Sequence, residues 1–312
     1  MEGFRFGFGE EANAVSLRDG QSMSGVSVDS SGRLKVGTAT LEFAGTDLKN
    51  SGQTDLLLKD SHGTHKAAIG TSLVAEGELA DIYYGTGKEA EADFSNSGES
   101  DLVIDLNNSN SYGKTTASVY NVQRVKGSDT ADNTMVGQDG KNNTLIAGDG
   151  GSNRLYGGKG GRDHLVGSST SEDTFYFGAD SGRDEIENFG EEDVLGLLGG
   201  SLSQASFDAG GRLKLNWQDE RGNSSQLTFA EDMKDKVITY DLGNGAHGAK
   251  FGEKLTVTDD TADLVDYYSS GSKEGDGSSL TLRNYGAQGA STFQLADSTW
   301  NYDRASGAWS RE

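Results

Sequence analysis

The sequence predicts an all-β protein whose centre is a parallel β-roll or β-solenoid, flanked by β-rich regions. Three observations predict this fold. Residues 124–173 repeat with a period of ten. Short apolar runs typical of strands recur along the rest of the chain, whereas only residues 231–236 suggest a helix. Proline is absent and glycine accounts for 46 of the 312 residues, so glycine, asparagine, aspartate and serine must build the turns.

The composition argues against several classes of protein. Hydrophobic residues make up 33% of the chain, which is too little for a large helical bundle or a dinucleotide-binding enzyme. The formal net charge of −22 argues against a nucleic-acid partner, because phosphate binding requires clustered lysine and arginine. An acidic chain suits cation binding or solubility. No run of eighteen apolar residues occurs, so we expect no membrane-spanning helix.

The first expected region, residues 1–76, is an N-terminal β-rich segment. It contains strand-like runs at residues 13–20, 24–29, 33–37 and 40–45, separated by turn residues. Residues 1–10 alternate phenylalanine and glycine and lack the basic start and apolar centre of a signal peptide. Cysteine is absent, which fits an exported protein but fits chance equally well.

One motif near this region resembles part of a protease. Asp60-Ser-His62-Gly-Thr-His65 is similar to the histidine motif of subtilisin-like enzymes, and Gly70-Thr-Ser72 is similar to their serine motif. The two motifs stand close together without helical patterning, whereas a catalytic triad draws its members from separate elements. We therefore expect no enzyme and no catalytic residues, and we expect His62 and His65 in a solvated loop.

The second expected region, residues 77–200, is the β-solenoid. Its decapeptide units begin at Arg124, Thr134, Thr144, Arg154 and His164. The second position of each unit is apolar, at Val125, Met135, Leu145, Leu155 and Leu165. The tenth position is always asparagine or aspartate, at Asn133, Asn143, Asn153, Asp163 and Asp173. Disorder would not keep these residues in phase, so the period predicts a folded repeat.

Each unit is too short for more than one strand and one turn, so two units should form one coil. Stacked coils would then place alternate units in the same column. One apolar column would contain Val125, Leu145 and Leu165. The facing column would contain Met135, Leu155 and Phe175. Together these columns would form the narrow shared core that makes a repeat protein stable.

The third expected region, residues 201–312, is a C-terminal β-rich module. Strand-like runs occur at residues 212–217, 225–230, 236–242, 254–258, 279–285 and 291–296, separated by turn residues. Aromatic residues in and outside this module offer surfaces on which sugars could stack, although strand aromatics usually pack in cores. They are Tyr83, Tyr84, Trp217, Tyr267, Tyr268, Trp300 and Trp309.

The central block resembles the RTX, or hemolysin-type calcium-binding, repeat family. The nearest local match to its nonapeptide is Gly157-Gly-Lys-Gly-Gly-Arg-Asp163-His-Leu165, with one extra residue before Arg162. Residues 173–195 resemble the segment that closes such repeat blocks. The resemblance implies export in an unfolded state through a one-step secretion channel, followed by folding in external calcium. It also implies that the turns bind calcium.

Calcium takes six to eight oxygen ligands, which glycine-rich turns supply as backbone carbonyls and aspartates supply as carboxylates. In stacked coils, residues 137–143, 157–163 and 178–184 would share one edge. There the resemblance implies ligands at Asp163 and Asp184, supported by Asp139 and Asp180, in turns that contain Gly157, Gly160 and Gly182. On the other edge the candidate ligands are Asp129, Asp132, Asp149 and Asp173.

The block departs from the family pattern in two respects. Its period is ten rather than nine, and Asn133, Asn143 and Asn153 stand where a carboxylate would serve calcium better. Stacked asparagines can instead form a ladder of amide hydrogen bonds without a metal. The sequence therefore leaves two interpretations of the tenth position open, and it favours calcium on the edge of Asp163 and Asp184.

Together these features predict a secreted or cell-surface calcium-binding repeat protein with a structural or adhesive role. Its expected partners are calcium and a cell-surface glycan or protein, or a second copy of itself. One alternative is that the repeats are the secretion module of an exported enzyme such as a hydrolase. Another is a filament or surface-layer subunit that assembles through exposed strand edges.

Overall fold

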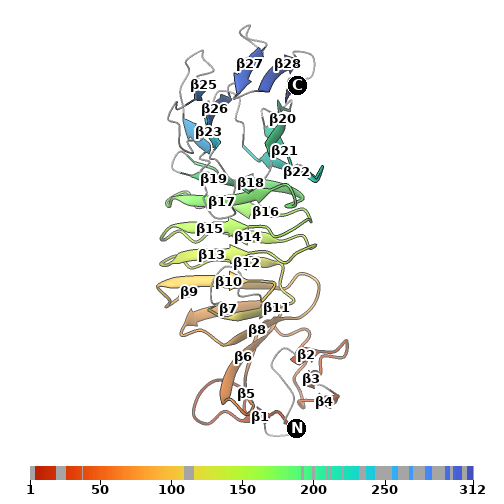
Figure 1. Ribbon diagram of the computed structural model, residues 1–312. Coiled ribbons are helices and arrows are strands. Elements are labelled where there is room, and N and C mark those ends of the chain that lie inside the picture. Colours follow the sequence, from red (N-terminus) through yellow and green to blue (C-terminus); the bar gives the residue numbers. More distant parts are fainter. Residues whose placement is uncertain are drawn as a thin grey trace. The chain divides into compact units, whose positions relative to one another are not determined.

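The structure is a computed structural model that describes residues 4–18, 26–36, 38–108, 116–190, 193–198, 201–208, 210, 212–219 and 221–231, and the strands beyond them (Figure 1). Strands account for 47% of the chain, and no helix occurs in the described residues. The all-β prediction is confirmed. The suggested helix at residues 231–236 lies, apart from Glu231, outside the described residues. No described segment forms a helix long and apolar enough to cross a membrane.

The chain divides into two compact units, Met1–Val136 and Gly137–Glu312. The first unit begins with a five-stranded sheet in the order β1-β5-β6-β8-β11. These strands are β1 (Ala14–Ser16), β5 (Thr54–Lys59), β6 (Thr64–Gly70), β8 (Ile82–Gly85) and β11 (Ser118–Tyr120). A small antiparallel sheet accompanies it, formed by β2 (Val26–Val28), β3 (Leu34–Val36) and β4 (Ala39–Leu41).

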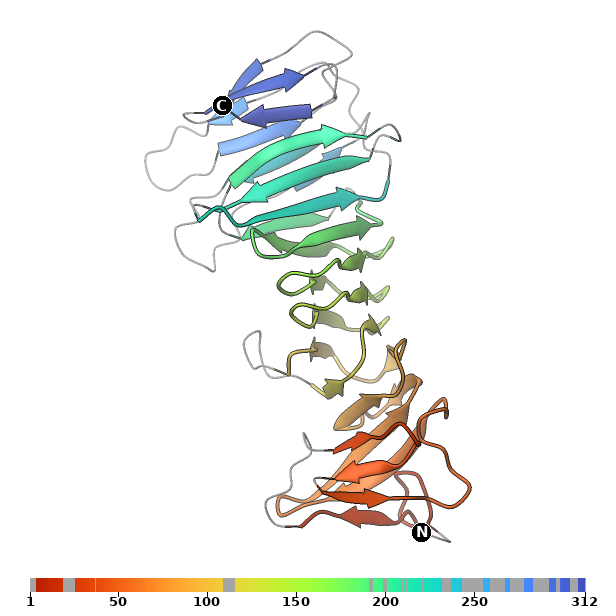
Figure 2. The ribbon, with the colours of Figure 1, turned by 90° about the vertical axis from the view of Figure 1, so that its right-hand side faces the viewer.

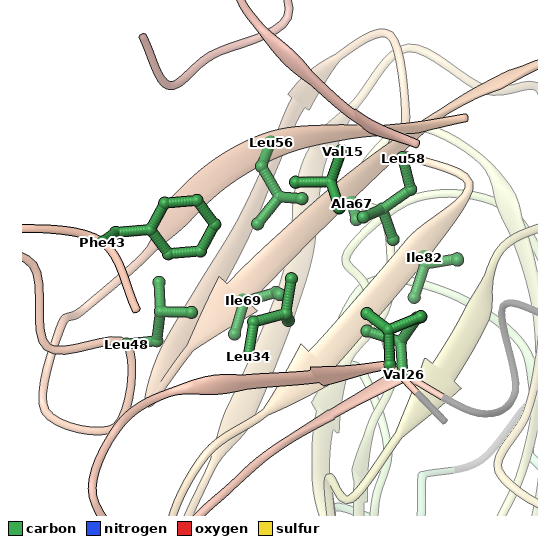
Figure 3. Packing of buried hydrophobic residues seen from close by; sticks show 11 residues of the cluster. Val15, Val26, Leu34, Phe43, Leu48, Leu56, Leu58, Ala67, Ile69 and Ile82 are labelled. Atoms are coloured by element: carbon green, nitrogen blue, oxygen red, sulfur yellow. The ribbon is translucent and has the colours of Figure 1, made fainter. Parts of the chain in front are cut away.

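An apolar cluster forms the core between these two sheets (Figure 3). Leu34 from β3 and Leu56 and Ile69 from the larger sheet are fully buried. Leu48, in the connection that precedes β5, is buried in the same cluster. Alternate residues of β3 and β5 are buried, as expected for strands that expose one face. Burial of these apolar side chains is the main stabilising contribution in this part of the chain.

Parallel pairing, which already joins β1 to β5 and β6 to β8, continues in the second half of this unit. β9 (Glu91–Ser97) pairs in parallel with β7 (Ser72–Gly77) and with β12 (Arg124–Lys126). β10 (Asp101–Asp105) pairs in parallel with β13 (Asp132–Val136). Val125 is thus in register with Ala92, and Met135 with Ile104. Both repeat positions point into the core, because all four side chains are buried.

Two parallel ladders build the first part of the second unit (Figure 2). One contains β14 (Thr144–Ile146), β16 (His164–Val166), β18 (Arg183–Glu187) and β22 (Ser224–Phe229). The other contains β15 (Asn153–Tyr156), β17 (Asp173–Gly178) and β19 (Val194–Leu198). Apart from the pairing of β18 with β22, each ladder pairs strands that alternate along the sequence.

The register of the ladders follows the apolar positions. Leu145 pairs with Leu165 in one ladder, and Leu155 pairs with Phe175 in the other. All four side chains are buried. These are the pairs that the ten-residue period predicts for alternate units. Branched and aromatic side chains stacked in this way shield one another from water, which no single unit could do.

Antiparallel strands complete the second unit. β20 (Ser201–Phe207), β21 (Leu213–Gln218) and β22 form a meander. β29 (Ala308–Arg311), β28 (Ser298–Asp303) and β27 (Thr292–Leu295) continue that sheet. A separate sheet has the order β24-β23-β26-β25. Its strands are β23 (Val237–Leu242), β24 (Leu255–Thr258), β25 (Tyr267–Ser269) and β26 (Ser278–Leu282).

The aromatic residues named as sugar-stacking candidates do not form an exposed platform where the structure describes their side chains. Tyr83 and Trp217 are 2% and 1% exposed, so both belong to the core. Tyr84 packs partly buried against the N-terminal cluster. The side chains of the other four lie outside the described residues: Tyr267, Tyr268, Trp300 and Trp309.

Candidate functional site

Three turns of the second unit lie side by side, at residues 137–143, 157–163 and 178–184. The N–H of Gly140 donates to the carbonyl of Lys159 at 2.7 Å, and the N–H of Gly160 donates to the carbonyl of Asp180 at 2.6 Å. The N–H of Arg162 donates to Oδ1 of Asn142 at 3.0 Å. The turns of alternate units therefore share one edge, as the two-units-per-coil interpretation expects.

Glycine is required at particular points of this edge. A Cβ atom on Gly157 would lie 2.5 Å from Oδ2 of Asp163, so any larger residue would collide with that carboxylate. Gly160 and Gly182 have φ angles of 64° and 104°, which L-residues with a side chain rarely adopt. These three glycines are the ones that the sequence analysis predicts for the turns. Gly157 brings the backbone close to the carboxylate of Asp163.

One column of buried polar side chains runs through these turns: Asn143, Asp163 and Asp184. Each lies at the start of a strand of the β14-β16-β18 ladder, and each is almost completely buried. Oδ1 of Asp163 accepts hydrogen bonds from the backbone N–H of Asn143 at 2.7 Å and from its Nδ2 at 2.9 Å. Oδ1 of Asp184 accepts one from the backbone N–H of Asp163 at 3.0 Å. The carboxyl groups thus point inward, between neighbouring strands of the ladder.

Burial makes ionisation of these carboxyl groups costly. It raises the pKa of Asp163 to about 6 and the pKa of Asp184 to about 8, and the neighbouring charge of Asp163 adds to the rise at Asp184. A proton on Asp184 can be donated to Asp163, so the two groups titrate as a pair. In the described residues, no N–H or hydroxyl donor reaches the buried Oδ2 atom of Asp163.

A second column lies in the other ladder: Asn153, Asp173 and Asp193. Nδ2 of Asn153 donates to Oδ1 of Asp173 at 2.7 Å, and the N–H of Asp173 donates to Oδ1 of Asp193 at 2.8 Å. The N–H of Ser168 donates to Oδ2 of Asp173, and that of Gly190 donates to Oδ2 of Asp193. Both oxygens of each carboxylate therefore have donors. Burial nevertheless raises the pKa of both aspartates, that of Asp193 to about 6.

Asp193 is a member of this column that the sequence analysis did not propose as a site residue. It falls twenty residues after Asp173, at the place of a tenth position. The decapeptide pattern is lost after residue 173, so only that spacing marks it.

The other predicted aspartates lie on the surface and do not join Asp163 and Asp184. Oδ1 of Asp139 accepts from the N–H of Lys159, and Oδ2 of Asp180 lies 3.3 Å from Nζ of the same lysine. Asp149 is exposed, and its carbonyl accepts the hydroxyl of Thr170. Asp129 belongs to the first unit, where Oδ2 lies 3.1 Å from Nζ of Lys126. In the described residues, no group of three or more histidine or acidic side chains is arranged to hold a metal ion.

The asparagines of the tenth positions use their amides within the protein. Oδ1 of Asn143 accepts from the N–H of Gln138, and its Nδ2 donates to several carbonyls that include Gly157. Oδ1 of Asn133 accepts from the N–H of Ser128 at 2.7 Å. These amides bond to backbone groups of their own turns, and the amide of Asn143 also bonds to the carbonyl of Gly157 in the neighbouring turn.

The protease-like motif closes a hairpin. Oδ1 of Asp60 accepts from the N–H groups of His62 and Gly63, and it lies 3.2 Å from Nε2 of His65. These bonds lower the pKa of Asp60, with the N–H of His62 as the largest cause. The hydroxyl of Ser72 donates to Oε1 of Glu91 instead. Asp60 therefore organises the turn between β5 and β6.

A comparison with known proteins finds no family model that matches this chain and no curated protein that is similar to it.

Proposed function

We propose that this protein is a secreted or cell-surface repeat protein with a structural or adhesive role, in which calcium stabilises the turns of a β-solenoid. The solenoid is proposed because strands of alternate units pair in parallel, as Thr144 does with His164 and Asn153 with Asp173. Two strands and two turns per coil account for this register. The resemblance to RTX repeats supports the secreted location.

The observation that carries the calcium proposal is the pair Asp163 and Asp184. Two carboxyl groups lie next to each other in a buried column, and burial opposes the charge of both. Oδ2 of Asp163 has no N–H or hydroxyl donor. A buried charge is normally paired, and a divalent cation would neutralise both carboxylates at once. The donor set therefore fits calcium at this one place.

Backbone carbonyls of the glycine-rich turns would provide the remaining oxygens. The fit is poorer elsewhere, because Lys159 already lies beside the carboxylate of Asp180. In the second column the amides and backbone N–H groups occupy the oxygens of Asp173 and Asp193. We therefore propose calcium at Asp163 and Asp184, and amide and backbone hydrogen bonds in the second column.

Calcium bound at this pair would couple folding to the environment. A ligand that binds the native state alone raises the free energy of unfolding as its concentration increases. At low calcium, the column would hold either a proton or an unfavourable pair of buried charges. Outside the cell, calcium would replace the proton. Turns that become stable only when calcium is bound would suit a protein that folds after export.

The test is thermal unfolding, followed by circular dichroism, in chelator and in about 1 mM calcium. We expect calcium to raise the melting temperature of the native protein and to leave that of D163N/D184N unchanged. Asparagine is a suitable replacement because Asn143 already occupies the same column. A matched control is D139N, which removes a surface carboxylate of the neighbouring turn and should keep the response. An unchanged melting temperature of the native protein would contradict the proposal.

A further inference from the structure

Two arginines stand side by side on the outer face of the β16-β18 ladder. The N–H of Glu185 donates to the carbonyl of Asp163, and the N–H of Arg183 donates to that of Gly161. This parallel pattern places Arg162 next to Arg183. Side chains alternate along a strand. Because Asp163 and Asp184 point inward, the two arginines point outward, and both are exposed.

This arrangement is unfavourable without a ligand. Like charges on directly neighbouring positions of a sheet repel each other. Other arginines of this acidic chain have carboxylate partners, such as Arg33 with Asp29 and Arg212 with Asp208, both at 2.8 Å. In the described residues, no ion pair joins Arg162 or Arg183 to a carboxylate.

The two arginines line a polar pocket of about 430 Å³. Its other outward-facing walls come from neighbouring strands, because β18 pairs with β16 on one side and with β22 on the other. The lining side chains are Arg162, His164, Arg183, Glu185, Gln226 and Thr228. Asp163 and Asp184, whose side chains point to the other face of the sheet, also border it. The volume suits a small ligand, and the walls provide hydrogen-bonding groups rather than apolar surface.

We infer that this pocket binds the acidic group of a sugar, a carboxylate or a sulfate, with Arg162 and Arg183 as its anchors. Guanidinium groups bind planar oxyanions through paired hydrogen bonds. Glu185, Gln226 and Thr228 provide acceptors and donors for ring hydroxyls. A single acidic sugar unit brings one charge to the two arginines, whereas the net charge of −22 would repel a long polyanion.

The inference deepens the adhesive role proposed above, since a surface protein would meet acidic glycans there. It does not depend on bound calcium. The arginines are held by the backbone pairing of β16 and β18, and their carboxylate neighbours point to the opposite face of the sheet. Calcium binding and sugar binding can therefore fail separately.

The experiment is isothermal titration of the full chain with glucuronate, with N-acetylglucosamine 6-sulfate and with neutral glucose. We expect at least one acidic sugar to bind and glucose not to bind; the sugar that binds identifies the oxyanion. R162Q/R183Q should bind the acidic sugar at least about tenfold more weakly, because the variant lacks both guanidinium groups. R221Q is the matched control, since Arg221 is exposed in the turn between β21 and β22, outside the pocket.

Three results would overturn the inference: neither acidic sugar binds, glucose binds as tightly as the acidic sugars, or R162Q/R183Q binds like the native protein. Free sulfate or acetate that binds as tightly as the sugars would overturn the sugar specificity. Circular dichroism of the same samples, with and without calcium, establishes that each variant is folded. A calcium response that is absent while the sugar still binds would contradict only the proposed function.

Discussion

The backbone N–H of Asp163 donates a hydrogen bond to Oδ1 of Asp184 at 3.0 Å, so two aspartates 21 positions apart are locked in one buried column. The same bond repeats one strand earlier in the ladder, from the N–H of Asn143 to Oδ1 of Asp163 at 2.7 Å. Each carboxyl group thus links two neighbouring strands of the ladder. Its charge state must then influence how stably the strands pair.

Stability in chelator should fall as pH rises from about 4 to about 8. The pKa of Asp163 is raised to about 6 and that of Asp184 to about 8, against about 4 for an unfolded aspartate. Between these values the native state holds more protons than the unfolded state, so the free energy of unfolding decreases with pH. Urea titrations at pH 5, 6.5 and 8 measure this free energy of unfolding. The decrease should be smaller in D163N/D184N, and equal decreases would contradict the assignment.

Gly157→Ala should destabilise the second unit by about 1–3 kcal/mol. The new Cβ would lie 2.5 Å from Oδ2 of Asp163, and the carboxylate is too buried to move away. Gly190→Ala is the control, because its Cβ would have no neighbour nearer than 3.7 Å. Chemical denaturation should separate the two variants. Equal stabilities would show that the turn can open around Asp163.

Leu165→Ala should cost about 2–5 kcal/mol, because it opens a cavity in the apolar column shared with Leu145 and Ile186. Val166→Ala in the same strand is the control and should cost much less, since that side chain is only partly buried. The free energies of unfolding come from urea titration. A small effect of Leu165→Ala would mean that neighbouring coils collapse into the space.

A fluorophosphonate probe should leave Ser72 unlabelled. Its hydroxyl donates to Glu91, while Asp60 is engaged by backbone N–H groups of its own turn. The nucleophilic serine of a Ser-His-Asp triad requires a histidine that accepts its proton. Intact-mass measurement detects labelling, and the S72A variant serves as the blank. Labelling that S72A abolishes would support the alternative of an exported hydrolase.

The period of the decapeptides was sufficient to predict the pairing of Leu145 with Leu165, because in-phase apolar residues have one way to share a core. The burial of Asp163 could also have been predicted from the sequence, although the sequence analysis proposed this residue only as a calcium ligand in a turn. It precedes Leu165 by two positions, and side chains two apart on a strand share a face. The same rule predicts that the side chains of Arg162 and His164 lie on the outer face of the sheet.

Other features could not be read from one sequence. The spacing changes from 20 residues between Asn143 and Asp163 to 21 before Asp184, and then β22 joins the ladder after an excursion through β19, β20 and β21. Such joins depend on long-range contacts rather than on local pattern. Trp217 and Tyr83 have the same local appearance as surface aromatics, and only the packing of their sheets buries them.

The extra residue before Asp184 has a practical consequence. His164 still pairs with Glu185, so the added length is absorbed entirely by the turn and the strands keep their partners. Turn length and strand register are therefore separable in this molecule. Because the carbonyl of Lys159 and the N–H of Gly160 bond to the turns on either side, an insertion that keeps the ladder intact must leave these two groups in place.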